Sequence, residues 1–359
     1  MPLFRIFFET LRTWVEGWLC LLLIVVPLSA CAGKPSQLRS PDGSYAQRED
    51  VMRFAQEVAE RHSLKESWVR HILRQASFQP AVTRHIMPAP PGMAKNWEAY
   101  RARMVEPTRL RLGLQFWRNN ERWLSLAQQR YGVPPEIVLG IIGVETIYGQ
   151  HMGGFRVVDA LTTLAFDFPA GRSDRSGFFR QELEHLLLLA RRENIDPLSL
   201  KGSFAGAIGM PQFMPGSIRN YAVDFDHDGH IDLRNNTADV IGSVAHYLAQ
   251  FGWERDWPTH FEVVPPGEQE PLATLLGPDI VPLFSPQEFT EKGAQLPHDA
   301  LEYPGKLALV QLQNGAAEPS YVAGTSNFYA ITRYNWSSYY AMAVISLGEA
   351  LRKARHQGS

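Results

Sequence analysis

The sequence predicts a mainly α-helical protein of the α+β class, with a small β-containing lobe near its C-terminal end. Helical periodicity and helix-ending signals dominate residues 49–256. Residues 257–325 are instead rich in proline and in short β-prone pieces. A last segment, residues 326–359, is again helical in pattern, and we expect it to return to the helical region.

Length and composition indicate a folded protein with a sizeable core. The chain has 359 residues, of which 45% are hydrophobic and 20% charged, so a disordered or fibrous protein is excluded. At about 150 residues per domain, this length suits two or three globular units. The formal net charge is -2, and we therefore expect no nucleic-acid partner. Two cysteines, Cys20 and Cys31, are too few for a disulfide framework or a cysteine-based zinc site.

The N-terminal residues have the pattern of a signal peptide. Residues 17–30 carry no charge and are too short to cross a bilayer core of about 30 Å as a helix. The segment Leu28-Ser-Ala-Cys31 resembles the lipobox of bacterial lipoproteins. This resemblance implies a signal peptide over 1–30, a lipidated Cys31 and a polar tether over 31–48. Alanine at position 32 implies sorting to the outer membrane, facing the periplasm of a Gram-negative-type bacterium. An ordinary secretory signal with an incidental cysteine stays an alternative.

Proline and glycine signals delimit the first predicted helices, which begin at about Glu49. Ser63 and Glu66 have the spacing of a capping box ahead of an apolar periodic run. Pro107 opens a long amphipathic stretch, which is expected to continue as one helix until Gly132 ends it.

The later elements include further helices, one loop region and the β-prone pieces of the lobe. Apolar periodicity predicts helices over residues 157–166, 177–194, 237–251 and 335–355. Glycine, serine and proline punctuate residues 201–217, which are expected to form a loop broken by a short helix. The β-prone pieces of the lobe are residues 261–264 and 280–284, followed by apolar residues at Leu307, Leu309 and Leu312.

The most apolar predicted helix, residues 134–149, carries a carboxylate in an aliphatic setting. Counting back three and four positions from Glu145 places Ile142 and Ile141 on the same helix face. Desolvation there would raise the pKa of Glu145 and favour the neutral acid, which can protonate a glycosidic oxygen and later act as a base. The alternatives are a solvent-facing glutamate and a buried glutamate paired with Arg156.

Four motifs in order resemble the membrane-bound lytic murein transglycosylase B family. They are Glu145-Thr-Ile-Tyr-Gly149, residues 203–216 (SFAGAIGMPQFMPG), residues 241–247 (IGSVAHY) and Arg333-Tyr-Asn335. The resemblance covers about residues 50–350. It implies a lysozyme-like helical core, a further helical domain and a small β domain.

The activity implied by this resemblance is cleavage of the β-1,4 bond between N-acetylmuramic acid and N-acetylglucosamine in peptidoglycan. The family adds no water, because the muramic acid 6-hydroxyl attacks its own anomeric carbon and gives a 1,6-anhydro end. By resemblance, Glu145 is the single catalytic acid and base, and Ser203, Gln212, Tyr334 and Asn335 lie near the scissile sugar. Ordinary structural roles, such as a helix cap for Ser203 or a core position for Tyr334, stay open.

Two other functions stay open at this point. Hydrolytic glycosidases generally use two carboxylates, and the further candidates, Asp159 and Asp167, have the context of cap or surface residues. A hydrolytic muramidase of the same fold is one alternative. A non-catalytic lipoprotein that binds peptidoglycan is the other.

An acidic loop over residues 224–239 has the spacing of a calcium site. Its oxygen donors resemble those of an EF-hand loop, with glycine at the sixth position; they are Asp224, Asp226, Asp228, the backbone carbonyl of His230, and Asp232. Asn235 stands at the twelfth position, where a glutamate is usual, and Asp239 could reach back from the next helix. The resembled family binds calcium in such a loop. The sequence therefore predicts a structural calcium ion, against the alternative of a solvated acidic turn.

Overall fold

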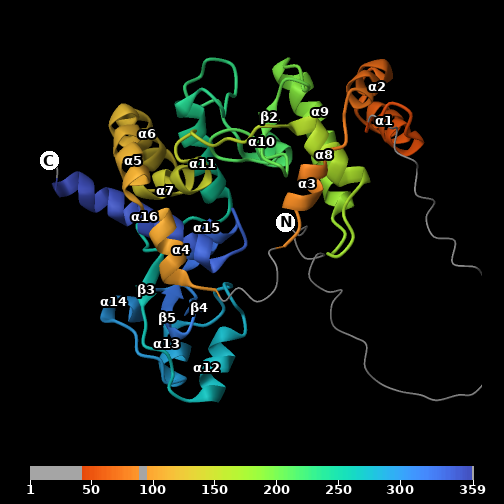
Figure 1. The fold of residues 1–359 in the computed structure, drawn as a ribbon. Coiled ribbons are helices and arrows are strands. Elements are labelled where there is room, and N and C mark those ends of the chain that lie inside the picture. The colour runs from red at the N-terminus through yellow and green to blue at the C-terminus, as the bar shows by residue number, and fades with distance from the viewer. Residues whose placement is uncertain (1–42, 89–94, 358–359) are drawn as a thin grey trace, which may run out of the picture. The chain divides into compact units, whose positions relative to one another are not determined.

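The computed structural model describes residues 43–88 and 95–357, and these are mainly helical, as predicted (Figure 1). The helices are α1 (Glu49–His62), α2 (Glu66–Arg74), α3 (Pro80–His85), α4 (Trp97–Met104), α5 (Pro107–Asn119), α6 (Glu121–Tyr131), α7 (Pro135–Thr146), α8 (Val157–Phe166), α9 (Ser176–Glu193), α10 (Pro215–Tyr221), α11 (Thr237–Gln250), α12 (Gln269–Leu276), α13 (Pro286–Glu291), α14 (His298–Leu301), α15 (Ser326–Thr332) and α16 (Ser338–Gln357). The strands are β1 (Phe155–Arg156), β2 (Lys201–Gly202), β3 (His260–Glu262), β4 (Ala308–Asn314) and β5 (Ala317–Gly324).

The predicted helix from Pro107 to Gly132 is two helices, α5 and α6, separated at Asn120. The Asn120 side-chain amide donates to the carbonyl of Phe116 at 2.9 Å, while its side-chain oxygen accepts from the Thr237 hydroxyl at 2.5 Å. The bond to Thr237 spans 117 positions of the chain, so local periodicity could not reveal it. The prediction of one continuous helix is therefore wrong at this point.

The capping box predicted at Ser63 is also wrong. Ser63 has a left-handed backbone (φ 54°), and its N–H donates to the last turn of α1. It therefore ends α1, and α2 begins at Glu66 without a side-chain cap.

Helices α7 and α16 pack closely and run in opposite directions. The first turn of α7 lies beside the end of α16, where Glu136 and Arg352 approach to 3.6 Å, and the end of α7 lies beside Tyr340. Glycine makes the contact possible: a Cβ atom at Gly140 would lie 2.3 Å from the carbonyl oxygen of Val344. This pair of helices holds the side chains of the candidate site.

The lobe has its own sheet and its own hydrophobic cluster. Strand β5 lies between β3 and β4, antiparallel to both. Buried side chains of the lobe, among them Phe261, Phe289 and Leu309, form a cluster separate from the main core. The β-prone piece 280–284 forms no strand in the described residues. It contributes one bridge, from Phe284 to Leu307, because Pro282 lacks the N–H that a ladder needs.

The predicted tether ends earlier than residue 48. Tyr45 is 1% exposed, and its hydroxyl donates to Asp167 at 2.7 Å. Arg48 is also buried and contacts both Asp50 and Asp167. Residues 43–48 therefore belong to the fold. The predicted signal peptide, Cys31 and the rest of the tether lie outside the described residues. Of the helices in the described part of the chain, none combines the length and apolar character needed to cross a bilayer.

Candidate active site

Glu145 occupies the last turn of α7, and only part of its side chain is exposed. Burial raises the pKa of Glu145 to about 7, and the hydroxyl of Tyr340, which donates to Oε1 at 2.7 Å, opposes part of that rise. The carbonyl end of a helix also disfavours an anion. The alternative pairing with Arg156 is wrong, because Arg156 lies 2.7 Å from Asp159. Glu145 is thus an acid that keeps its proton close to neutral pH.

The chain turns sharply directly after this acid. The predicted helix to Gly149 ends at Thr146 instead, since Ile147 (φ 52°), Tyr148 (φ 54°) and Gly149 (φ 88°) are all left-handed. A left-handed backbone is costly for a β-branched residue such as isoleucine. Strain of this kind persists only where surrounding contacts impose it, and it is commonly found at functional sites.

Tyrosines surround the Glu145 carboxyl. Tyr340 bonds to it, and the rings of Tyr340 and Tyr334 are stacked with centroids 6.3 Å apart. Burial, together with the nearby Glu145 charge, raises the pKa of Tyr334, Tyr340 and Tyr100. These phenols therefore stay protonated at neutral pH. Tyr247 continues the cluster, 4.9 Å from the Tyr334 ring.

Sequence reasoning did not identify Tyr340. The sequence does contain one indication of its role: Tyr340 lies on the apolar face of the last helix, four positions before Val344. A buried phenol needs a hydrogen-bond partner, so a tyrosine at this position predicts a polar contact. That signal does not name the partner, which lies 195 positions away.

Ser203 and Gln212 form hydrogen bonds within the loop of residues 203–216. The Ser203 hydroxyl oxygen accepts from the N–H groups of Ala205 and Ala207, at 3.3 and 3.0 Å. The Gln212 side-chain amide donates to the carbonyls of Gly209 and Met152, and its backbone is left-handed (φ 51°). These contacts fix both side chains in the loop. No helix begins at Ser203 in the described residues, so the alternative of a helix cap is wrong.

Tyr334 joins this loop to the tyrosine cluster, whereas Asn335 lies exposed. The Tyr334 hydroxyl donates to the carbonyl of Pro211 at 2.7 Å, next to Gln212. The side chain of Asn335 makes no hydrogen bond within the part of the chain that the structure describes. The geometry therefore brings Glu145, Tyr334 and the Gln212 loop together, and it gives Asn335 no contact with them.

The other carboxylates weighed as a second acid have structural partners. Asp159 is buried and accepts from Arg156 and from the N–H of Ser77. Asp167 accepts from Tyr45 and Arg48. Within the residues that the structure describes, neither carboxylate forms a hydrogen bond with Glu145.

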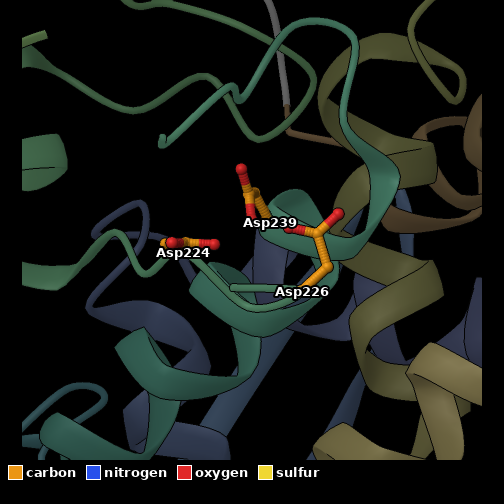
Figure 2. A group of neighbouring side chains, drawn as sticks. All are labelled: Asp224, Asp226 and Asp239. Atoms are coloured by element: carbon orange, nitrogen blue, oxygen red, sulfur yellow. The ribbon is translucent and has the colours of Figure 1, made fainter. Parts of the chain in front are cut away.

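Three aspartates of the acidic loop converge. Asp224, Asp226 and Asp239 each offer an oxygen, and these atoms lie within 4.8 Å of one another (Figure 2). Asp224 and Asp226 precede the turn of the loop, and Asp239 reaches them from the first turn of α11. Burial, and repulsion by the other two carboxylates, raise the pKa of Asp239 to about 6. Asp226 Oδ1 is buried and has no hydrogen-bond partner among the described residues.

This arrangement fits a hard cation. A buried carboxylate oxygen without a partner is costly, and a cation held by oxygens would satisfy it. Asp228 and His230 are exposed, and the Asp228 carboxylate accepts from the His230 N–H. The structure thus brings together three of the predicted side-chain donors and leaves Asp228 and Asp232 outside the converged group.

Enzymes use a carboxylic acid held neutral by burial to protonate the leaving oxygen of a glycosidic bond. The Glu145 carboxyl, partly exposed and with a pKa raised to about 7, has the properties of such an acid. Residues 46–349 match the family described as Transglycosylase SLT domain, and the chain belongs to this family.

Three relatives support this assignment. The chain is 37% identical to the membrane-bound lytic murein transglycosylase B of Escherichia coli, over 95% of this chain and 99% of that protein. It resembles the Escherichia coli lytic transglycosylase Slt35 in complex with calcium, with 38% identity and a TM-score of 0.77 over 89% of this chain and 98% of that one. It also resembles Pseudomonas aeruginosa SltB3 in complex with NAG-anhNAM-pentapeptide, with 28% identity and a TM-score of 0.70 over 86% of this chain and 80% of that one. The predicted fold class, with its lysozyme-like helical core, is confirmed.

Proposed function

We propose that this peptidoglycan lytic transglycosylase cleaves the β-1,4 bond between N-acetylmuramic acid and N-acetylglucosamine without water, and that Glu145 is its only acid and base. The observation that carries the proposal is the position of Glu145, where burial raises its pKa to about 7 beside the Tyr340 hydroxyl. Membership of the family supports the reaction class.

The reaction proceeds in two proton transfers through one carboxyl group. Protonated Glu145 gives its proton to the glycosidic oxygen as the bond from that oxygen to the anomeric carbon breaks. The 6-hydroxyl of the same muramic acid then attacks the anomeric carbon, and the Glu145 carboxylate takes the hydroxyl proton. The products are a 1,6-anhydro end and a free 4-hydroxyl. Since no water is activated, the reaction needs no second carboxylate, in agreement with the structural partners of Asp159 and Asp167.

Residues of the loop and of the tyrosine cluster would hold the glycan. Ser203 and Gln212 are fixed by the backbone of their loop, and Tyr334 ties that loop to the Glu145 side. Asn335, exposed beside Tyr334, would contact a sugar without first losing a protein partner. The complex of SltB3 with NAG-anhNAM-pentapeptide supports a glycan ligand of this kind.

Product analysis tests the reaction. Purified peptidoglycan digested with the protein is expected to give chain ends that are one water lighter than hydrolysed ends, as measured by mass spectrometry. Reducing ends that carry the added water would instead identify a hydrolytic muramidase. Absence of any cleavage would identify a binding protein.

The role of Tyr340 gives a prediction about pH. Activity is expected to fall as the pH rises through about 7, because Glu145 then loses the proton that it must donate. The Tyr340 hydroxyl stabilises the carboxylate and lowers this pKa, so Tyr340→Phe should move the alkaline limb of the kcat/KM profile to higher pH, by up to about one unit. The matched control is Tyr339→Phe, which removes a hydroxyl bonded to the backbone of Gln313. An alkaline limb at unchanged or lower pH in Tyr340→Phe would contradict this role.

We further propose that Asp224, Asp226 and Asp239 bind a calcium ion, with Asp228 and the carbonyl of His230 completing the ligand set. The support is the convergence of three carboxylates, the unpartnered oxygen of Asp226 and the calcium complex of Slt35. Bound calcium would neutralise the mutual repulsion of the acidic loop, which is a structural role.

Calcium is expected to raise the melting temperature. Saturation at 100 times the dissociation constant corresponds to a stabilisation of about 2.7 kcal/mol. Asp226→Asn should abolish the calcium-dependent rise, and without calcium it should melt no lower than the parent, because it removes one repelling charge. Calorimetry with and without a chelator measures both effects. An equal melting temperature of the parent protein in calcium and in chelator would contradict the proposed calcium site.

The N-terminal segment supports a proposal about location. Residues 1–30 would be removed as a signal peptide, and Cys31 would carry lipid that anchors the enzyme to the outer membrane, facing the periplasm of a Gram-negative-type cell. The relative in Escherichia coli is membrane-bound. The division into a catalytic region (49–256), a lobe (257–325) and a returning segment (326–359) is likewise proposed, and the lobe's own hydrophobic cluster supports it.

Cysteine substitutions test the anchor. Cys31→Ser is expected to move the protein from the membrane fraction to the soluble periplasmic fraction, because it removes the lipidated thiol. Cys20→Ser, which lies inside the proposed signal peptide, should leave the protein in the membrane fraction. Membrane partition of Cys31→Ser equal to that of the parent would contradict lipidation.

A further inference from the structure

The hydroxyl of Thr146 connects three parts of the candidate site. Thr146 directly follows Glu145 and is fully buried. Its Oγ1 donates to the carbonyl of Met210 at 2.8 Å and accepts from the N–H of Gly149 at 3.0 Å. The carbonyl of Ile142 in its own helix is farther away, at 3.4 Å. One side chain therefore ties the end of α7 both to the left-handed turn and to the loop of residues 203–216.

Met210 continues this connection to the acidic loop. Its N–H donates to the carbonyl of Leu233 at 2.8 Å. The two segments are in close contact here, because a Cβ atom at Gly209 would lie 2.3 Å from the same carbonyl oxygen. Leu233 follows Asp232, whose N–H donates to Asp239 Oδ2 at 2.8 Å. Short hydrogen bonds thus lead from a proposed calcium ligand to the residue beside the catalytic acid.

We propose that Thr146 is a positioning residue, which fixes Glu145 against the 203–216 loop and couples that placement to cation binding by the 224–239 loop. The inference rests on the proposed function. A cation held by Asp239 would fix the carboxylate that orients Asp232 and, through it, Leu233. Linkage makes the coupling reciprocal: if the cation favours the connected arrangement, the connected arrangement favours the cation.

Thr146→Val is the direct test, because valine keeps the shape and removes the hydroxyl. The change leaves the Met210 carbonyl and the Gly149 N–H without their partner. We expect kcat on peptidoglycan to fall about tenfold and the calcium dissociation constant to rise about fivefold, the lower end of typical coupling between sites. Titration calorimetry with calcium chloride alone gives the second value without any use of activity.

Two variants serve as controls. Thr146→Ser keeps the hydroxyl and should restore both kcat and calcium affinity to within about twofold of the parent. Thr162→Val makes the same chemical change in α8, at a fully buried hydroxyl that has no hydrogen-bond partner in the structure, and it should alter neither quantity. Equal losses in Thr146→Val and Thr146→Ser would overturn the role of the hydroxyl.

A double-mutant cycle tests the coupling itself. Asp226→Asn removes a proposed calcium ligand and so weakens the coupling between the two sites. In a protein that already carries Asp226→Asn, Thr146→Val should therefore have a smaller effect. The loss of kcat in the double variant should therefore be smaller than the product of the two single losses. Losses that simply multiply, or an unchanged calcium affinity in Thr146→Val, would overturn the proposal.

Two further variants distinguish a failure of the positioning role from a folding defect and from a failure of the proposed function. If Thr146→Val does not fold, Gly209→Ala disturbs the same connection from the loop side, and it should lower kcat and calcium affinity together. A loss of only one of the two would contradict the coupling. Glu145→Gln tests the proposed function separately: full activity there refutes the mechanism, while an inactive Glu145→Gln with a normal Thr146→Val refutes only the positioning role.

Discussion

Glu145→Gln is expected to lower kcat on peptidoglycan by about 1,000-fold, within the range that a general acid–base group contributes. Glutamine keeps an oxygen that can accept from Tyr340, so the local packing stays the same. It has no proton acidic enough for the glycosidic oxygen and no carboxylate to take the proton of the 6-hydroxyl. KM should stay within about threefold, because the lost interaction belongs to the transition state. Steady-state turnover with purified peptidoglycan measures both constants.

The matched control is Glu136→Gln, the same change at the other end of α7. Glu136 forms an ion pair with Arg352, whose side chain is more than half exposed. Loss of this ion pair should therefore cost little stability or activity. Turnover by Glu145→Gln equal to that of Glu136→Gln would contradict the assignment of Glu145 as the only acid and base.

Gly140→Ala is expected to destabilise the protein by about 3 kcal/mol, the upper end of the usual cost of overpacking. The added Cβ would lie 2.3 Å from the Val344 carbonyl oxygen, and a backbone atom cannot move aside by changing a rotamer. Helices α7 and α16 would have to separate. Because these helices carry Glu145 and Tyr340, their hydrogen bond and the enzymatic activity should weaken with the stability.

Gly177→Ala provides the comparison for this substitution. Gly177 lies in the first turn of α9, and a Cβ atom there meets nothing within 4 Å. Its replacement should leave the free energy of unfolding unchanged or raise it by up to about 1 kcal/mol. Urea denaturation of both variants measures the difference. Equal stability of Gly140→Ala and Gly177→Ala would show that the close contact between α7 and α16 is wrong.

Local signals predicted the helices well where the sequence itself marks their ends. Val157–Phe166 matches the predicted range, α9 is shifted from its predicted range by one residue at each end, and α11 ends one residue earlier than predicted. The predictions failed where a distant contact decides the local structure. Asn120 breaks a periodic stretch because it bonds to Thr237. The turn after Thr146 is left-handed at an isoleucine, which no propensity predicts, and the Thr146 hydroxyl just before it bonds to the carbonyl of Met210, 64 positions away.

The candidate site was predictable to a similar extent. The apolar face around Glu145 follows from positions three and four residues back, and it correctly indicated a raised pKa. The loop spacing indicated Asp224, Asp226 and the later Asp239. The contact of Tyr340 with Glu145 could not be predicted from the sequence. It depends on how α7 and α16 pack, and no local pattern gives that arrangement.

The pKa of Glu145 itself is the most direct test of the account. Carboxyl carbon NMR of protein labelled in glutamate, with Glu145→Gln used to assign the signal, follows its titration in the folded enzyme. We expect a midpoint of about 7, well above the ordinary glutamate value of 4.5. A midpoint at the ordinary value would mean that the carboxyl is already ionised at neutral pH, and Glu145 could not then be the acid that protonates the glycosidic oxygen.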